Sequence, residues 1–483
     1  MSAATATAPP SRARRRPGGT ARNYVGAGLV VGLAVALTVA AGTRPSFDAY
    51  GWLDWGHMTL HGGLDTNAAP SFKPLPYVFT LVYGLLGEGA ATWLWMFTAT
   101  AVSLAGVLLA GRLARTLCAT GGGRGWAGWV AAVLAGVALL AVHDELHYDY
   151  VHYILSSQSD PMIVACVLGA ADCQLRGRPR AAFWLLVAAS LGRPEAWPLL
   201  VADGAWLWRG APGCRAMVVA GLAAVGLLWF GIPALSSRSW LIAADNADAS
   251  GFGPTGNKAL GVLERWAMQA PWPLWAAAAA AVGVAVRRRE TLALWLIAGV
   301  VVWMAIEVAF GLHGWPALGR YMFEPTAVVI VLGASLIGRL LSGALARPGG
   351  RAIGTGARLA AGVVAVVLIA AVVPRLVSEG RAEHSDLVAQ HARTRSLQAL
   401  SATIGRLGGG ARLRRCGEVI SVGLETQTVL AYDVGENVNR VGYKYPQPGH
   451  PHNPIVVFRP RGSGWTVRAR RQRAPGCRGL GVD

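Results

Sequence analysis

The sequence predicts an α-helical polytopic membrane protein with about eleven transmembrane helices and a small α+β domain after them. Hydrophobic residues make up 53% of the 483 residues and charged residues only 14%, which is too apolar for a soluble chain of this length. Apolar runs recur along most of the chain, and a helix needs roughly 20 such residues to cross a bilayer. Basic residues gather in alternate connections between the runs, a pattern typical of membrane proteins.

The first apolar run, from about residue 24 to 42, follows a basic stretch that includes Arg14, Arg15 and Arg16. A secretory signal has a similar pattern, but no convincing small-residue cleavage site follows and many more runs come later. We therefore expect an uncleaved first helix, preceded by a basic cytoplasmic tail over residues 1–23.

The remaining apolar runs complete a predicted transmembrane domain over residues 24–374. They lie near residues 91–111, 126–142, 160–175, 181–192, 196–208, 217–234, 271–286, 291–311, 321–338 and 359–374. Backbone polar groups must be satisfied internally in lipid, so we expect these runs to be helices. The runs at 181–192 and 196–208 are each too short to cross, and together they predict a pair that turns at residues 192–195 on the far side.

Basic residues in the short connections predict the orientation, because Lys and Arg resist translocation. With the amino terminus inside, arginines fall on the cytoplasmic side at positions 112, 115, 124, 176, 178, 180, 209, 215, 287, 288, 289, 339, 347, 351 and 358. An odd number of spans then places residues 375–483 outside, in a multi-pass protein of a bacterial inner membrane. The net charge of +19 is explained by arginines that orient the helices. We expect no nucleic-acid partner, because the sequence has no basic groove pattern.

Residues 375–483 are expected to form an extracytoplasmic α+β domain. A helix over residues 386–407 ends at three glycines, and five strand-like runs follow at 418–422, 428–432, 440–445, 455–459 and 465–468. Cys416 and Cys477 both lie on the oxidising side, where disulfides persist, so we expect them to pair. Two free thiols are the alternative interpretation. The other four cysteines fall in predicted helices or cytoplasmic connections.

Ionisable groups at or just outside membrane depth are costly, so they are candidates for function. They occur in four places on the predicted outer face. Asp48 and Asp54 lie in an aromatic stretch after the first span, and Lys73 precedes a short apolar segment over 77–87 that is expected to lie along the membrane interface. The other candidates are His143 and Asp144 in the second outer loop, Asp160 at the start of the next run, Arg193 at the short turn, and Arg320 with Tyr321 before a late run.

The chain resembles the GT-C superfamily of polyprenyl-phosphate-sugar-dependent glycosyltransferases, in particular bacterial mannosyl- and arabinosyltransferases. These motifs occur in a similar order and on the same predicted side of the membrane. The resemblance covers residues 1–374. It is carried by the aspartate-bearing first loop with its Lys-Pro-Leu-Pro at 73–76, by His143-Asp144-Glu145 and Ser159-Asp160-Pro161, by the Arg193 turn and by Gly319-Arg320-Tyr321. Many members have adjacent Asp-Glu in the first loop, whereas here Asp48 is followed by Ala49 and the next aspartate is Asp54.

The resemblance implies an enzyme that transfers a sugar from a polyprenyl phosphate to a cell-envelope glycan, lipid or protein on the extracytoplasmic face, usually with inversion. Asp48, Asp54 and Asp160 are then candidate catalytic carboxylates, with Asp48 preferred as general base. Substrate and phosphate binding would fall to Lys73, Arg193, Arg320, Tyr321, His143 and Asp144. A divalent cation is a candidate cofactor, although no tight ligand spacing indicates one.

Each of these residues also has a structural interpretation. Asp48 and Asp160 are placed where helix caps occur, and Asp54 could lie on a helix surface. Arg193 and Arg320 could anchor helix ends at the membrane interface. At the level of function, the alternatives are a membrane transporter or lipid-linked-sugar flippase and a non-catalytic scaffold. Transporters place polar residues at the bilayer midplane, so the crowding of carboxylates on one face favours the enzyme.

Overall fold

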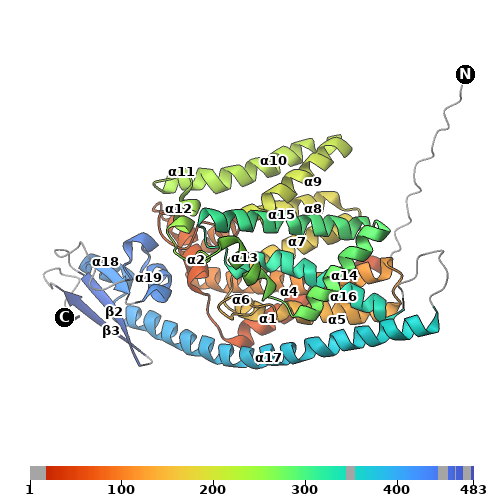
Figure 1. Ribbon diagram of the computed structural model, residues 1–483. Helices are drawn as coiled ribbons and strands as arrows, with labels where there is room; N and C mark the ends of the chain where they lie inside the picture. The colour runs from red at the N-terminus through yellow and green to blue at the C-terminus, as the bar shows by residue number, and fades with distance from the viewer. Residues whose placement is uncertain are drawn as a thin grey trace, which may run out of the picture.

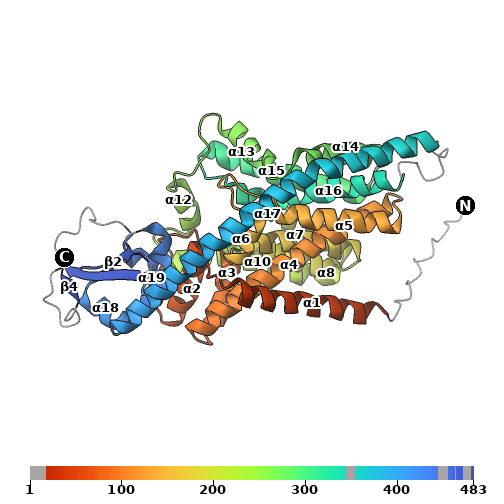
Figure 2. The ribbon, with the colours of Figure 1, turned by 90° about the horizontal axis from the view of Figure 1, so that it is seen from below.

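The computed structural model describes residues 18–343, 354–421, 423–443, 455–462, 464–470 and 480–482. It is a long bundle of helices with a small domain at one end (Figure 1). Helices α1 (Gly18–Ala41) and α17 (Thr355–Arg406) both begin at the opposite end of the bundle (Figures 1 and 2). We call the end of the bundle that carries the small domain the domain end. The opposite end, where α1 and α17 begin, is called the arginine end.

Within the described residues, five helical segments are long and apolar enough to cross a membrane. They are α4 (Glu88–Thr120), the segment Pro212–Ser236, α15 (Thr291–His313), the segment Gly319–Leu341 and α17. The segment Pro212–Ser236 joins η2 (Pro212–Cys214), α10 (Arg215–Gly226), η3 (Leu227–Gly231) and α11 (Ile232–Ser236). A sixth span is possible only if α13 (Lys258–Ala267) and α14 (Trp272–Arg288), which meet at 101°, are counted as one.

The prediction of about eleven spans is therefore wrong for the described part of the chain. Among the predicted spans, the runs at 126–142 and 160–175 form helices that are too short, α5 (Gly125–Leu140) and α7 (Asp160–Leu175), and the apolar part of α1, Gly26–Ala41, is also shorter than a full span. The helices α8 (Pro179–Gly192) and α9 (Trp197–Gly210) are short, as expected for the runs at 181–192 and 196–208. A helix of 16 residues reaches about 24 Å at 1.5 Å per residue, less than the roughly 30 Å of a hydrocarbon core. The chain is a helical protein with membrane-type helices, but with fewer full-length spans than its apolar runs suggest.

Helix α16 (Phe323–Leu341) forms the centre of the bundle. Every residue from Phe323 to Arg339 is buried, and the helix contacts α4, α5, α7, α14, α15 and α17. Small residues let helices approach closely. A side chain at Gly333 would meet the carbonyl oxygen of Leu274 on α14 at 2.7 Å. By contrast, the apolar half of α17 exposes Leu359, Val363, Val366 and Val367, a surface suited to lipid.

The arginine end contains side chains from connections that the sequence assigns to the cytoplasm. Arg339 donates to Glu290 at 2.8 Å and to the carbonyl of Leu117, which joins the ends of α16 and α4 to the α14–α15 turn. Arg112 of α4 pairs with Asp172 of α7 at 2.9 Å. These basic groups lie at the end opposite the C-terminal domain, as the predicted orientation requires, while the sidedness of the membrane stays a prediction.

Short helices occupy the domain end (Figure 2). They are α2 (Phe47–Leu60), α3 (Pro74–Gly84), α6 (Tyr150–Leu155), η1 (Pro194–Ala196), α12 (Ile242–Asp248), α13 and η4 (Gly319–Met322). The aromatic stretch after the first span forms α2, and its Trp52 and Trp55 are fully buried against Trp95 and Phe72. Burial of such large rings fixes α2 against the bundle.

The C-terminal domain begins without a break from α17, a helix of 52 residues that continues through Pro374. The predicted helix over 386–407 is the outer half of α17. Next come α18 (Gly410–Cys416), β1 (Glu418–Ser421), η5 (Leu424–Thr426), α19 (Gln427–Val434), η6 (Val438–Arg440), β2 (Ile455–Arg461), β3 (Gly464–Arg470) and β4 (Gly481–Val482). The sheet order is β1-β2-β3-β4, with β1 parallel to β2, β2 antiparallel to β3, and β3 parallel to β4.

Two of the predicted strands are not strands in the described residues. Residues 428–432 belong to α19, whose Gln427–Tyr432 are all buried. A segment buried on every side shows no alternation, so composition alone does not separate a strand from a helix there. The run at 440–445 contains only an isolated bridge between Gly442 and Ile420, and its last two residues are outside the described chain. Cys477 is also outside it, so the disulfide with the buried Cys416 stays a prediction.

Candidate functional site

An ion pair joins the first outer segment to the start of the central helix. An Nη atom of Arg320 donates to Oδ2 of Asp48 at 2.9 Å, although the residues are 272 positions apart. Asp48 lies in the first turn of α2, and Arg320 lies in η4 directly before α16. Their side chains are 16% and 19% exposed, so the pair is accessible at the domain end.

A second set of charges lies beside this pair and is almost fully buried. Asp160 opens α7 and accepts a hydrogen bond from Arg193 at the end of α8. Lys73, which precedes α3, places its Nζ 3.5 Å from the same Asp160 oxygen and 3.4 Å from the Ser159 hydroxyl. Glu195 lies 3.7 Å from Arg193. Four separate elements therefore bring these groups together.

Tyr321 connects the two sets. The guanidinium carbon of Arg193 lies 3.9 Å from the centre of the Tyr321 ring, and that of Arg320 lies 5.7 Å from it. Cation–π contacts of this kind are attractive and hold a guanidinium group in place. We call Asp48, Lys73, Asp160, Arg193, Arg320 and Tyr321 the ion-pair cluster. Six of the nine predicted catalytic and binding residues meet in it.

The charges of the cluster are balanced, and its three cations are the groups that an anionic ligand would contact. The cluster contains three cations and two carboxylates, with Glu195 balancing Arg193 from one side. Burial lowers the pKa of Lys73 to about 8, because Asp160 only partly offsets burial and the repulsion from Arg193 and Arg320. Burial alone would raise the pKa of Asp160, but Lys73, Arg193 and Arg320 together lower it below its usual value. An added anion would stabilise the charge of Lys73.

Both arginines also have unused hydrogen-bond donors. Among the described residues, the buried Nε atoms of Arg193 and Arg320 have no hydrogen-bond partner, and neither has Oδ2 of Asp160. Buried polar groups in native structures are nearly always paired, so these two donors are available to a further partner. A guanidinium group binds two oxygens of one phosphate through a planar fork. The cluster is therefore equipped to bind a phosphate between Arg193, Arg320 and Lys73.

Asp54 lies apart from the cluster. Its side chain is fully buried, and in the described chain neither carboxylate oxygen has a hydrogen-bond partner. Burial, and next the carboxylate of Glu436 in the C-terminal domain, raise the pKa of Asp54 well above its usual value. The Asp54 side chain thus lies between α2 and the C-terminal domain, near Glu436 and Val438. Of the two aspartates on α2, the structure brings only Asp48 to the arginines.

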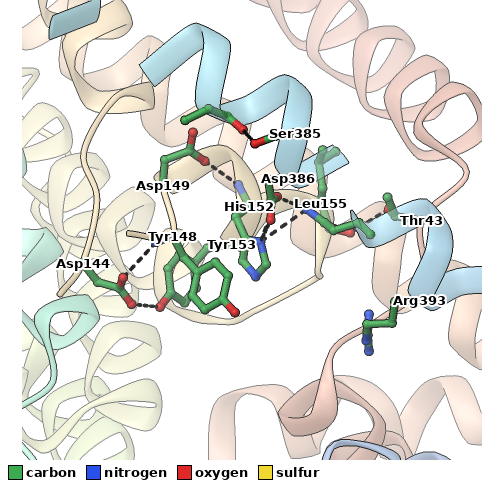
Figure 3. A network of polar contacts seen from close by, with 12 residues as sticks. Thr43, Asp144, Tyr148, Asp149, His152, Tyr153, Leu155, Ser385, Asp386 and Arg393 are labelled. Atoms are coloured by element: carbon green, nitrogen blue, oxygen red, sulfur yellow. Dashed lines mark hydrogen bonds and ion pairs between the residues drawn. The ribbon is translucent and has the colours of Figure 1, made fainter. Parts of the chain in front are cut away.

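His143 and Asp144 shape the second outer loop instead of entering the cluster. Asp144 accepts hydrogen bonds from the backbone amides of Leu146 and Tyr148, at 2.9 and 3.0 Å, and from the Tyr153 hydroxyl. Figure 3 shows Asp144 beside Tyr148 and Tyr153. His143 Nε2 lies 3.9 Å from Glu379 of α17. Their contacts fold the loop and fasten it to α17.

The same loop is joined to α17 by a second contact. Asp149 accepts from the backbone amide of His152 at 2.8 Å, which caps α6. The His152 ring lies 2.9 Å from both oxygens of Asp386, a residue of α17 (Figure 3). The loop therefore has fixed contacts with the outer half of α17.

Three residues that sequence reasoning did not assign hold the segment before Arg320. Glu145 accepts from the Gly319 amide at 2.7 Å and lies 3.7 Å from Arg265. Arg265 donates to the carbonyls of Pro316 and Ala317 at 2.6 and 3.0 Å, and Gln269 donates to the carbonyl of Gly319. No sequence spacing could reveal these contacts, because each joins segments at least 50 residues apart.

Within the described chain, no group of three or more His, Cys, Asp or Glu side chains is placed to hold a metal ion. No protein-family model matches this chain, and no curated protein is significantly similar to it in sequence. Any assignment of function therefore rests on the chemistry of the ion-pair cluster and on its place in the fold.

Proposed function

We propose that the protein is an integral-membrane glycosyltransferase that moves a sugar from a polyprenyl phosphate to a cell-envelope acceptor on the extracytoplasmic face. The observation that carries the proposal is the convergence of Lys73, Arg193 and Arg320, with unused arginine donors, beside the accessible carboxylate of Asp48. A lipid-phosphate donor presents its phosphate near the membrane surface, at the ends of the membrane-spanning helices. In support of this, Arg320 lies near the start of the candidate span Gly319–Leu341.

The cations would bind the donor phosphate. Arg193 and Arg320 offer planar forks beside the Tyr321 ring, and Lys73 adds a third positive charge. In the absence of donor, Arg320 is paired with Asp48. Phosphate competes for this guanidinium group, so donor binding releases the Asp48 carboxylate for proton transfer.

Asp48 would then act as the general base. It removes the proton of an acceptor hydroxyl while that oxygen forms a bond to the anomeric carbon of the sugar. The bond from this carbon to the phosphate oxygen breaks, and the polyprenyl phosphate leaves with the electron pair, stabilised by the arginines. Attack opposite the leaving group inverts the anomeric configuration. Asp160, held by Arg193 and Lys73, is a positioning residue in this scheme.

A transporter or lipid-linked-sugar flippase is the second candidate. It is favoured by Glu307 of α15 and Glu324 of α16, which are buried in two candidate spans with no hydrogen-bond partner among the described residues. Ionisable groups within spans often belong to ion or proton pathways. The enzyme remains the first choice because the cations and Asp48 meet at the ends of the helices.

The two aspartates of α2 provide a matched test. We expect Asp48→Asn to lower sugar transfer by roughly 10²- to 10⁴-fold, the usual contribution of a general base. Asp54→Asn replaces a buried carboxyl group outside the ion-pair cluster by an amide of the same shape and should retain transfer. The measurement uses purified full-length protein in nanodiscs with radiolabelled polyprenyl-phosphate-mannose and polyprenyl-phosphate-arabinose and a membrane extract as acceptor.

Full transfer by a folded Asp48→Asn protein would remove this residue from the mechanism. If the wild-type protein transfers neither sugar but moves the labelled lipid between the leaflets of a proteoliposome, the second candidate replaces the enzyme.

A further inference from the structure

A polar cavity of about 340 Å³ lies between the membrane helices and the C-terminal domain. One wall comes from α2 and the start of α4, and the other from α18 and the end of α19. The polar side chains of the lining are His57, His61, Glu88, Arg414 and Asp433. None of them belongs to the ion-pair cluster. His57 follows Asp48 by nine residues on α2, which is about 13 Å along the helix axis.

The membrane-side wall combines imidazole and carboxylate groups. The rings of His57 and His61 are 4.1 Å apart, and His57 Nδ1 lies 3.6 Å from Glu88. His61 Nδ1 lies 2.8 Å from the backbone carbonyl of His57, so its Nε2 is the ring atom left for a ligand. Burial lowers the pKa of His57 and so favours its neutral form. A neutral imidazole ring has one hydrogen-bond donor and one acceptor.

The opposite wall provides a carboxylate and a guanidinium group that are fixed in position. Asp433 accepts from the Ser401 hydroxyl at 2.6 Å. Arg414 donates to the carbonyls of Val434 and Gly435, the latter at 2.9 Å. Gly435 has φ +65°, and a side chain there would meet an Nη atom of Arg414 at 2.9 Å. Hydrogen bonds within the protein thus hold the Asp433 carboxylate and the Arg414 guanidinium group in position.

The mixture of charges selects the class of ligand. Glu88 and Asp433 repel a phosphate or carboxylate, and Arg414 repels a cation. A sugar hydroxyl, in contrast, donates to a carboxylate and accepts from a guanidinium or imidazole group at the same time. We propose that this cavity binds a neutral sugar residue of the acceptor glycan, distant from the residue that reacts. The proposal rests on the proposed function, because it assigns a subsite to that enzyme's acceptor.

The test measures binding of neutral mannose and arabinose oligosaccharides to full-length protein in nanodiscs by saturation-transfer NMR. Galacturonate oligosaccharides serve as the charged comparison. Ala411→Trp places a large side chain on the cavity wall, and Ala389→Trp places the same side chain on an exposed position of α17 outside the lining. We expect at least a tenfold weaker Kd for the Ala411→Trp protein, no change for Ala389→Trp, and much weaker binding of galacturonate to the wild type.

Asp433→Asn is a smaller change of the same wall, and we expect it to weaken neutral-oligosaccharide binding several-fold. Retained binding of polyprenyl phosphate by both variants shows that they are folded. Absence of neutral-oligosaccharide binding to the wild type would overturn the proposal. Equal binding by the two tryptophan variants would overturn it as well.

The experiment also separates this proposal from the proposed function. Asp48→Asn should bind the oligosaccharides like the wild type, although its sugar transfer is strongly lowered. If wild-type protein transfers sugar and Ala411→Trp leaves the KM for acceptor unchanged, the cavity proposal fails and the enzyme stands. If Ala411→Trp abolishes oligosaccharide binding in a protein that transfers no sugar from any donor, the cavity binds glycan and the transferase proposal fails.

Discussion

Lys73 gives the ion-pair cluster a dependence on pH. Its pKa is lowered to about 8, so the side chain is charged below this pH and neutral above it. A charge-assisted hydrogen bond contributes roughly 1.5–3 kcal/mol, so its loss weakens phosphate binding about tenfold or more. We expect the affinity for polyprenyl phosphate to fall as the pH rises from 7 to 9, measured by titration of nanodisc-bound protein.

Two variants identify Lys73 as the titrating group. Lys73→Arg keeps its charge over this range and should remove the decrease, whereas Lys73→Met should bind weakly at every pH. A decrease of the same size in Lys73→Arg would assign the pH dependence to another residue.

The sequence predicts all six residues of the ion-pair cluster, but three of the nine residues that it assigns to the site, Asp54, His143 and Asp144, lie outside the cluster. Asp48, Arg193 and Arg320 could be found because polar groups beside apolar runs are rare and these share one side of the membrane. Asp54 could not be separated from Asp48, since both follow the same span and only packing shows that α2 turns Asp54 under the C-terminal domain. His143 and Asp144 were given binding roles because their hydrogen bonds within the loop are invisible in the sequence.

The turn η4 depends on a neighbouring loop for its position. Glu145 binds the Gly319 amide at 2.7 Å, one residue before Arg320, and so acts as a positioning residue. We expect Glu145→Ala to raise the KM for the donor several-fold, because Arg320 would lose its fixed approach to the phosphate. Glu145→Gln retains an acceptor oxygen for the Gly319 amide, so its donor KM should be close to that of the wild type.

Kinetics with a polyprenyl-phosphate sugar distinguish this role from general stability. Equal donor KM values for wild type and Glu145→Ala would contradict it. So would a Glu145→Gln protein that regains the wild-type melting temperature while its donor KM stays raised.

The ends of the short helices are predicted well, but their relation to the membrane is not. The apolar runs at 126–142, 160–175 and 181–192 match α5, α7 and α8, which have 14 to 16 residues. Counting the first two runs as spans is the error, because a short apolar helix can be buried by its neighbours instead of crossing the membrane. At α17 the sequence suggests a domain boundary near Pro374, whereas the helix continues to Arg406.

The domain end and the arginine end of the bundle should be accessible from opposite sides of the membrane. The C-terminal domain and the arginine end lie at opposite ends of the bundle (Figures 1 and 2), and the arginine distribution assigns the latter to the cytoplasm. We expect Ala389→Cys, on the outer half of α17, to react with a membrane-impermeant thiol reagent in intact cells. Thr120→Cys, at the arginine end of α4, should react only after permeabilisation.

Labelling is scored against the wild-type protein, which contains the four free cysteines at 118, 166, 173 and 214. The reverse labelling pattern would show that the C-terminal domain lies in the cytoplasm. It would also place the ion-pair cluster on the cytoplasmic side.

The most direct measurement is the equilibrium binding of polyprenyl phosphate and of the uncharged polyprenol to the full-length protein in nanodiscs. The two ligands share the lipid chain and differ in the phosphate, so their ratio of Kd values reports the phosphate contacts alone. We predict that the wild-type protein binds the phosphate at least tenfold more tightly and that Arg193→Met with Arg320→Met removes the difference. Equal affinity of the wild-type protein for both lipids would contradict the assignment of the ion-pair cluster to a lipid phosphate.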